Sequence, residues 1–259
     1  YDTVSFKNVV SNGLVLDKNG QKMSKRLGNA ADPFDTLKEY GADATRWYMM
    51  ANSDPWDNLK FDLEGIEEVR RKLFGTLFNT YSFFTLYANI DDWQPQTGLS
   101  IPVADRPEID RWIISKLNSL TKEVQEQLSA YEPTKACRAV ERFVDEHLSN
   151  WYVRLCRRRF WKGEMNTDKQ AAYETLYECL VTTSQLMSPV APFFSDWLYR
   201  SLNVTRINRN ETAASVHLTE WPKTDVAAIN PKLETSMALA QQVCSLVLSL
   251  RKKEKIKVR

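Results

Sequence analysis

The sequence is poor in glycine, histidine and paired cysteine. Its 259 residues include 8 glycines, 2 histidines and 4 cysteines. His147 and His217 have no carboxylate or cysteine at ligand spacing, so we interpret both as structural and expect no metal site. The cysteines are widely spaced in helix-like stretches without a Cys-x-x-Cys pair, which predicts buried, reduced thiols in a cytosolic protein. They are Cys137, Cys156, Cys179 and Cys244.

Long apolar runs and a large net charge are also missing. No run of about 18 consecutive apolar residues occurs, which argues against a membrane span. The net charge is +2, so any nucleic-acid contact must come from local clusters of cations. Few glycines and a mostly helical apolar period predict a mainly α chain after a short mixed start.

The first 20 residues contain the strand signals. Two apolar segments, 4–10 and 14–16, read as strands, and the second enters an Asn19-Gly20 turn. Two strands cannot form a stable domain by themselves. We therefore expect this region to be the edge of a sheet whose other strands lie outside the sequence.

A cluster of cations follows the turn. Lys22, Lys25 and Arg26 surround the small pair Met23-Ser24. A loop leaves backbone N–H groups free, and lysine is a compact charge on a flexible stem, so the cluster suits a phosphate that moves during a reaction. Polyphosphate binding is therefore the chemical hypothesis, and a solvated surface loop is its alternative.

Caps, prolines and apolar spacing predict a series of helices. One starts at Asp32-Pro33 and ends at Tyr40-Gly41, and a long one covers 62–90, with aromatic residues that we interpret as core. The prolines of 91–107 indicate a linker. Further helices are predicted over 108–131, 133–162, 167–187, 192–202 and 231–250, with an irregular stretch over 204–221, extended at 215–218.

A second cluster of cations lies within 149–162, which carries five cations and no acid. At helical pitch, three arginines and a second tryptophan share a face with Trp151, and Lys162 follows them. Guanidinium groups bind phosphates and indoles stack on bases, so this face predicts an RNA surface. Ion pairs with acids such as Glu141 or Glu178 are the alternative. The face comprises Trp151, Arg154, Arg157, Arg158, Trp161 and Lys162.

The tail from Arg251 to Arg259 carries six cations against Glu254, which adds a second basic region. An anionic membrane surface is one conceivable partner for such a tail. The tail lacks an amphipathic aromatic face, so we expect no membrane partner.

The lysine cluster resembles the signature loop of class I aminoacyl-tRNA synthetases in Lys22-Met23-Ser24-Lys25 and departs from it at Arg26, where serine is usual. The Tyr-Gly-Ala-Asp-Ala-x-Arg of residues 40–46 is similar to the continuation seen in the isoleucine, valine and leucine group. Asp110 to Ile113, followed by Asn150 to Arg154, resembles the anticodon-binding domain of the isoleucyl members. Valyl members usually have an acid at the position of Arg154.

The resemblance covers essentially the whole chain, including residues 256–259, where an isoleucyl pattern breaks off. It implies the end of a Rossmann-type catalytic domain over 1–61, a connecting helix and linker over 62–107, and a helical-bundle anticodon-binding domain over 108–259. It also implies a part of a cytoplasmic, monomeric enzyme that activates isoleucine with ATP and Mg²⁺ and transfers it to tRNA(Ile).

The resemblance assigns roles to the loop. Lys22 and Lys25 would hold the ATP phosphates, and Lys25 would also stabilise the departing pyrophosphate. Met23 would pack near the adenine, Ser24 would fix the turn, and Arg26 would complete the ATP loop. The family's His-x-Gly-His signature is absent, because the two histidines are far apart in the sequence. We therefore expect no complete active site and no activity from this chain alone. A valyl or leucyl enzyme, and a non-catalytic helical RNA-binding module, remain alternatives.

Overall fold

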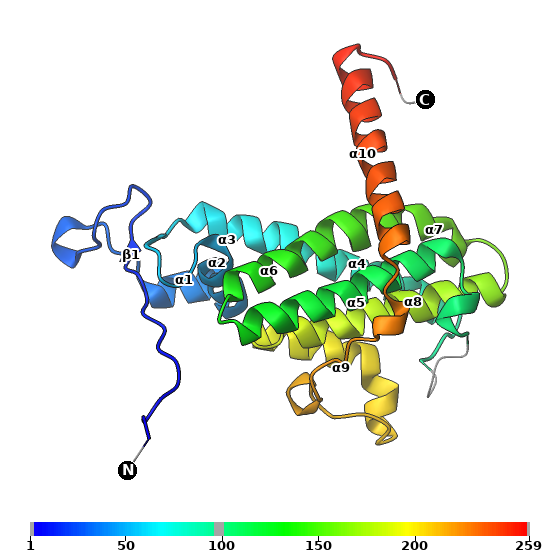
Figure 1. Cartoon of the computed structure of the whole chain (residues 1–259), viewed down its shortest axis with the longest axis horizontal. Coiled ribbons are helices and arrows are strands. Elements are labelled where there is room, and N and C mark those ends of the chain that lie inside the picture. Colours follow the sequence, from blue (N-terminus) through cyan, green and yellow to red (C-terminus); the bar gives the residue numbers. More distant parts are fainter. Residues whose placement is uncertain (1–2, 96–100, 258–259) are drawn as a thin grey trace.

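The computed structural model describes residues 3–95 and 101–257. The last two residues of the predicted 256–259 pattern and residues 96–100 of the predicted linker lie outside this description. The described chain is mostly helical and has one two-stranded sheet, which confirms the mainly α prediction. The helices pack lengthwise, the sheet lies at one end, and α10 projects from the side near the other end (Figure 1).

The sheet pairs segments that are distant in sequence. Strand β1 (Val15–Leu16) runs parallel to β2 (Leu59–Lys60), and an antiparallel bridge between Leu16 and Lys22 closes the predicted turn. The strand predicted over 4–10 is wrong, because these exposed residues find no partner strand among the described residues. The prediction missed β2 because its apolar signal is only a few residues long.

The first helices begin and end where the capping residues predict. In α1 (Pro33–Tyr40), the Asp32 carboxylate accepts hydrogen bonds from the first turn. Helices α2 (Ala42–Asn52) and α3 (Leu63–Val69) follow. The predicted 62–90 helix is confirmed as a continuous run of α3, a π-helical segment η2 (Arg70–Phe74) and α4 (Gly75–Ile90).

Later helices form the bundle. The predicted 133–162 helix is one run that widens in its middle, as a π-helix lies between α6 and α7. Helix α9 continues six residues beyond its predicted end at Leu202, and Val216–Leu218 forms a 3₁₀ turn instead of an extended segment, because the Ser215 hydroxyl caps that turn. The elements are α5 (Glu108–Ser129), α6 (Pro133–Arg142), η4 (Phe143–Val153), α7 (Arg154–Trp161), α8 (Thr167–Met187), α9 (Pro192–Asn208) and α10 (Pro231–Lys253).

One hydrophobic core joins helices α2 to α4 to the bundle. Trp47 of α2 and Leu77 of α4 are fully buried in the same cluster as Trp112 and Tyr152 of the bundle. The Trp47 Nε1–H also donates to Glu141 Oε1 of α6 at 2.9 Å. Helix α2 is therefore fixed to the bundle by apolar burial and by a polar contact at the same place.

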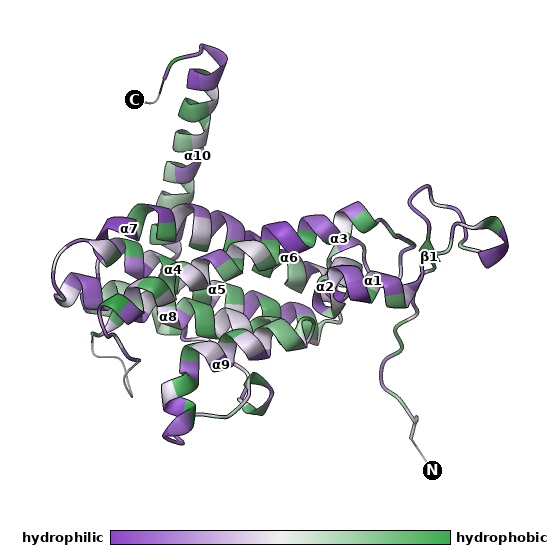
Figure 2. Ribbon diagram, turned by 180° about the vertical axis from the view of Figure 1, so that it is seen from behind, coloured by the Kyte–Doolittle hydropathy of each residue, from purple (hydrophilic) through white to green (hydrophobic). Residues whose placement is uncertain are grey.

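Helix α10 differs from the others because none of its residues is buried against the rest of the described chain. By length and composition it is apolar enough to cross a membrane, although polar residues such as Gln241 and Ser245 interrupt any unbroken apolar run. Figure 2 shows hydrophobic and hydrophilic residues together along it. Cys244 is exposed on this helix, so the prediction of four buried thiols is wrong for it, whereas the other three are buried.

Candidate functional site

The lysine loop, residues 21–29, carries a single helical turn at its tip. Ser24 caps the 3₁₀ turn Lys25–Leu27, and its Oγ accepts a hydrogen bond from the Arg26 N–H at 3.2 Å. The turn ends at Gly28, whose φ of 67° lies in the left-handed region that favours glycine. Ser24 thus caps this turn through its hydroxyl, although Arg26 stands where the family usually has a further serine.

The three cations of the loop are available to a ligand. The side chains of Lys22, Lys25 and Arg26 are exposed and, within residues 3–95 and 101–257, none forms an ion pair or a side-chain hydrogen bond. Met23 is half-buried beside them. Three mobile charges on a short loop are suited to a polyanion such as a nucleotide phosphate chain.

Asp17 and Asn29 anchor the base of the lysine loop. Asp17 Oδ1 accepts the backbone N–H groups of Asn19 and Gln21 at 3.0 and 2.8 Å, and its Oδ2 accepts Asn29 Nδ2 at 2.9 Å. Asn29 Oδ1 in turn accepts the Ser24 N–H at 2.9 Å. The bond from the Gln21 N–H and that from Asn29 lower the pKa of Asp17. We did not predict either residue, although Asp before an Asn-Gly turn is a signal for such a loop.

The basic surface, residues 151, 154, 157, 158, 161 and 162, lies on and beside α7. Arg154, Arg157, Arg158 and Lys162 are exposed and have no ion pair with any described residue. The side chain of Trp161 is 61% exposed next to them. The four cations can bind the phosphates of an RNA backbone, and the exposed indole can stack on an unpaired base.

Trp151 does not share this exposure. It is half-buried, and its Nε1 lies 3.1 Å from the Sδ atom of Met237 on α10. Trp151 lies within the π-helical segment η4, so the ideal α-helical spacing used for the prediction does not hold there. The structure therefore brings five of the six predicted residues together on an open face and places Trp151 under α10.

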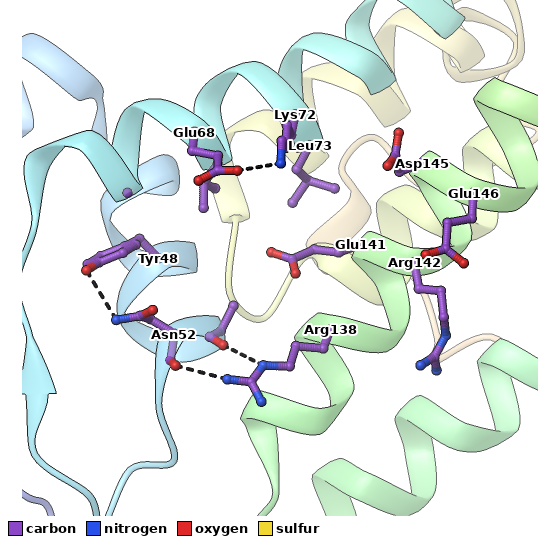
Figure 3. Close-up of a pocket in the computed structure, with 13 residues that line it drawn as sticks. Tyr48, Asn52, Glu68, Lys72, Leu73, Arg138, Glu141, Arg142, Asp145 and Glu146 are labelled. Carbon is purple, nitrogen blue, oxygen red and sulfur yellow. Dashed lines mark hydrogen bonds and ion pairs between the residues drawn. The ribbon is translucent and has the colours of Figure 1, made fainter. Parts of the chain in front are cut away.

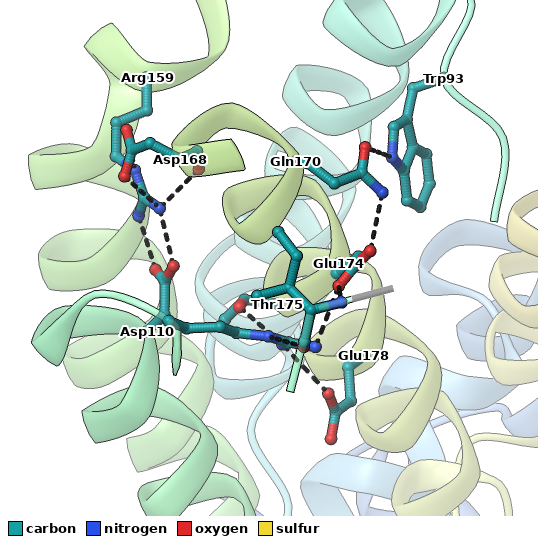
Figure 4. A network of polar contacts seen from close by, with 10 residues as sticks. Trp93, Asp110, Arg159, Asp168, Gln170, Glu174, Thr175 and Glu178 are labelled. Atoms are coloured by element: carbon teal, nitrogen blue, oxygen red, sulfur yellow. Dashed lines mark hydrogen bonds and ion pairs between the residues drawn. The ribbon is translucent and has the colours of Figure 1, made fainter. Parts of the chain in front are cut away.

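Arg159, which the predicted face omitted, forms the internal ion pairs of this helix. Its Nη1 and Nη2 lie 2.6 and 2.7 Å from the two carboxylate oxygens of buried Asp110 on α5, and its Nη2 lies 3.0 Å from Asp168 Oδ1 (Figure 4). The acids proposed as partners for the exposed arginines have other contacts. Glu141 binds Trp47, and Glu178 lies 3.6 Å from Arg106.

Buried polar contacts also anchor the described parts of segment 91–107. The Arg106 side chain is fully buried and donates to Thr175 at 2.9 Å and to Glu174 at 3.3 Å (Figure 4). Trp93 is buried and donates from Nε1 to Gln170 at 3.1 Å. The proline-rich segment that we interpreted as a linker is therefore held against α8 at both of these described residues.

A cavity of about 520 Å³ opens between helices α2 and α3 on one side and α6 and η4 on the other (Figure 3). Polar residues such as Asn52, Arg138 and Glu141 line it together with apolar ones such as Val69 and Leu73. No residue of the lysine loop or of the basic surface lines it. The two predicted sites lie on open surfaces at opposite ends of the molecule (Figure 1), and the cavity lies among the helices between them.

Comparison with known proteins identifies the family of the chain. Residues 110–259 match the family "Anticodon-binding domain of tRNA ligase", and residues 1–62 match "tRNA synthetases class I (I, L, M and V)". The first match covers more than half of the chain, so the chain belongs to the family of tRNA ligases with this anticodon-binding domain.

The sequence relatives carry one more specific name. Isoleucine--tRNA ligase from Porphyromonas gingivalis is 60% identical over 99% of this chain, that from Bacteroides thetaiotaomicron is 58% identical over all of it, and that from Thermus thermophilus is 43% identical over all of it. The chain spans 22%, 22% and 24% of these relatives, respectively.

A solved structure shares the fold. The leucyl-tRNA synthetase of Agrobacterium radiobacter, in a ternary complex with tRNA and LeuAMS, superposes with a TM-score of 0.62. The superposition covers 85% of this chain and 24% of the other at 20% identity. This likeness concerns the fold alone.

Proposed function

We propose that this chain is the part of an isoleucine--tRNA ligase that carries the ATP-phosphate loop and the helices that bind tRNA(Ile). The observation that carries this proposal is the geometry of the lysine loop. Its base is fixed by the hydrogen bond between Asn29 and Asp17, and its cations are exposed to solvent. The identity of 57–60% to five isoleucine--tRNA ligases supports the choice of amino acid. The division into 1–61, 62–107 and 108–259 remains part of the proposal.

The loop would act on ATP. Lys22 would hold the phosphates, and Lys25, at the start of the exposed turn, would stabilise charge that develops on the departing pyrophosphate. Met23, Ser24 and Arg26 would shape the rest of this site. Mg²⁺ would arrive on the phosphates of the nucleotide.

The basic surface would bind the tRNA. Arg154, Arg157, Arg158 and Lys162 would contact phosphates, and Trp161 would stack on a base. Trp151 would support this surface from beneath α10, where it contacts Met237. By analogy with the isoleucine--tRNA ligases it resembles, the parent enzyme would act in the cytoplasm as a monomer, without a membrane partner.

The direct test is aminoacylation by the complete protein that contains this chain, with isoleucine, valine and leucine in parallel reactions. The proposal requires charging of tRNA(Ile) with isoleucine. Charging with valine or leucine would select the related enzymes instead, and tRNA binding without any charging would select a non-catalytic RNA-binding module. Residues 1–259 alone should show no isoleucine-dependent ATP–pyrophosphate exchange, because catalysis needs both halves of the site in place.

A further inference from the structure

The C-terminal end of α2 is capped by side chains of α6. The buried hydroxyl of Thr134 lies 2.7 Å from the carbonyl oxygen of Met50 and 3.0 Å from that of Ser53. The last carbonyls of a helix have no partner within the helix. Thr134 therefore satisfies a need of α2 from a different part of the chain.

Arg138, one helical turn further along α6, caps the two carbonyls between them. Its Nε donates to the Ala51 oxygen at 2.8 Å and its Nη2 donates to the Asn52 oxygen at 2.9 Å (Figure 3). The planar fork of a guanidinium fits two successive carbonyls, and a single ammonium does not. Together, Thr134 and Arg138 fix the position of the α2 end relative to the bundle.

The segment after α2, residues 53–58, links the end of α2 to the strand that precedes the lysine loop. The Gly13 N–H donates to the Pro55 oxygen at 2.8 Å, and the Leu14 N–H donates to Asn58 Oδ1 at 2.8 Å. The two backbones approach so closely that a Cβ on Gly13 would lie 2.1 Å from the Asp57 oxygen. This segment and the strand must therefore move together.

A second contact fixes the same sheet to α2. The Tyr48 hydroxyl donates to the Lys60 oxygen at 2.7 Å and accepts the Asp62 N–H at 3.2 Å. Strand β2, which contains Lys60, pairs with β1, and β1 leads directly to Asp17 at the base of the lysine loop. A continuous path of hydrogen bonds and intervening backbone thus runs from α6 to the loop.

We infer that Thr134 and Arg138 are positioning residues for the lysine loop. They hold the α2 end, the sheet and the loop base in a fixed relation to the helices that carry the basic surface. Neither touches the loop, so each acts through α2. This inference rests on the proposed function only for its catalytic consequence, because the positioning itself is measurable without a substrate.

The first measurement is amide hydrogen exchange of residues 14–29 in the complete ligase. Arg138→Met keeps most of the apolar stem and removes both donors. Arg142→Met is the matched control, because Arg142 lies one turn further on the same run, lines the same cavity and forms an exposed ion pair with Glu123. We expect severalfold faster amide exchange in residues 14–29 with Arg138→Met, and an unchanged exchange rate with Arg142→Met. Equal exchange in the two variants overturns the inference.

The second measurement is the rate of adenylate formation across an ATP titration. Because small misplacements of reacting groups are costly, Arg138→Met should slow this rate by roughly 10- to 100-fold, with a smaller change in ATP affinity. Arg138→Lys should recover only part of the rate. If Arg138→Met does not fold, Thr134→Val provides the same comparison. A normal rate with only a lower melting temperature would assign the contacts to stability and overturn the inference.

The two proposals can fail separately. If Lys25→Ala leaves adenylate formation unchanged, the proposed role of the loop fails, whatever Arg138 does to hydrogen exchange. If Lys25→Ala slows the reaction while Arg138→Met changes neither rate nor exchange, the positioning inference fails and the function stands.

Discussion

Arg159 and Asp110 form a two-point ion pair where the end of α7 meets the start of α5, with nitrogen–oxygen distances of 2.6 and 2.7 Å. Asp110 is fully buried and also accepts the hydroxyl of buried Tyr152 at 2.8 Å. Burial alone would lower the pKa of Arg159, but its hydrogen bonds to Asp110 raise it above the ordinary value. The pair fixes the rotation of α7, and this rotation leaves the neighbouring Arg157 and Arg158 facing solvent.

The first prediction concerns this pair. Arg159→Ala leaves the Asp110 carboxylate buried without its charged partner, so it should lower the free energy of unfolding by about 3–5 kcal/mol. Arg158→Ala, at the adjacent exposed position, should change it by less than about 0.5 kcal/mol. Urea unfolding followed by circular dichroism measures both. Similar values for the two variants would show that Arg159 does not hold α7.

The second prediction concerns the tRNA surface. Replacing Arg154, Arg157 and Arg158 by alanine should weaken tRNA(Ile) binding and reduce the dependence of affinity on salt, because fewer counterions are released. The matched control replaces Arg200, Arg209 and Lys223, which are equally exposed cations on α9 and beyond it and pair with nearby acids. The control removes the same charge and should have the smaller effect. Equal losses would indicate a general charge effect and no specific surface.

The third prediction uses His147, whose pKa burial lowers from 6.5 to about 4. Lys116 and Arg142 add to this shift, Glu234 opposes it, and the Trp112 ring packs against the imidazole at 5.9 Å. Below pH 6.5 His147 is protonated in the unfolded chain, whereas in the folded chain it stays neutral until about pH 4. The contribution of His147 to stability is therefore fully present above pH 6.5 and should fall by about 3 kcal/mol as the pH is lowered to 4.

His147→Gln removes the titrating group and should flatten this part of the stability profile. His217→Gln is the control, since His217 is the other histidine of the sequence and is exposed. Chemical unfolding at several pH values between 7 and 4 measures the slopes. An unchanged slope in His147→Gln would contradict the assignment.

The fourth prediction concerns the base of the lysine loop. Because the Gln21 N–H and Asn29 stabilise the ionised form, the pKa of Asp17 lies below its ordinary value of 3.8. The loop should stay ordered as the pH falls to that value and lose its anchor only below it. The amide resonances of Gln21 and Asn29, followed by NMR through an acid titration, report this transition. Asp17→Asn should shift both resonances at neutral pH, and a variant with native shifts would contradict the anchor.

The sequence predicts the helices well because their signals are local. Asp32 before Pro33, and the left-handed Gly41 after Tyr40, define α1 at both ends. Strand β2 was missed because its partner β1 is distant in sequence, and pairing at a distance leaves little local pattern. The segment 91–107 looked like a linker because composition does not reveal the burial of Arg106.

The candidate sites divide in the same way. The cations of both sites are visible in the sequence because exposed charges need no partner to be recognised as a cluster. Asp17 and Asn29 were missed because their contact joins the two ends of a loop. Arg159 differs from the arginines beside it because it forms ion pairs with acids on α5 and α8, which the local sequence does not reveal. Trp151 was misplaced because the π-helical winding of η4 changes the angle between successive residues.

The central claim is that Lys25 acts on charge that develops as pyrophosphate leaves, so its contribution should appear in the transition state. Removing one such electrostatic donor costs about 100- to 1000-fold in rate. In the complete ligase, Lys25→Ala should therefore slow adenylate formation by about that factor, with a smaller loss of ATP affinity. Lys25→Arg should recover little, because a planar fork does not replace a compact ammonium.

The decisive measurement is pre-steady-state adenylate formation across an ATP titration. Lys18→Ala serves as the control, since Lys18 is an exposed lysine in the turn just before the lysine loop. The account predicts a large drop in the maximal rate for Lys25→Ala and a normal rate for Lys18→Ala. A normal maximal rate with only weakened ATP binding in Lys25→Ala would contradict it.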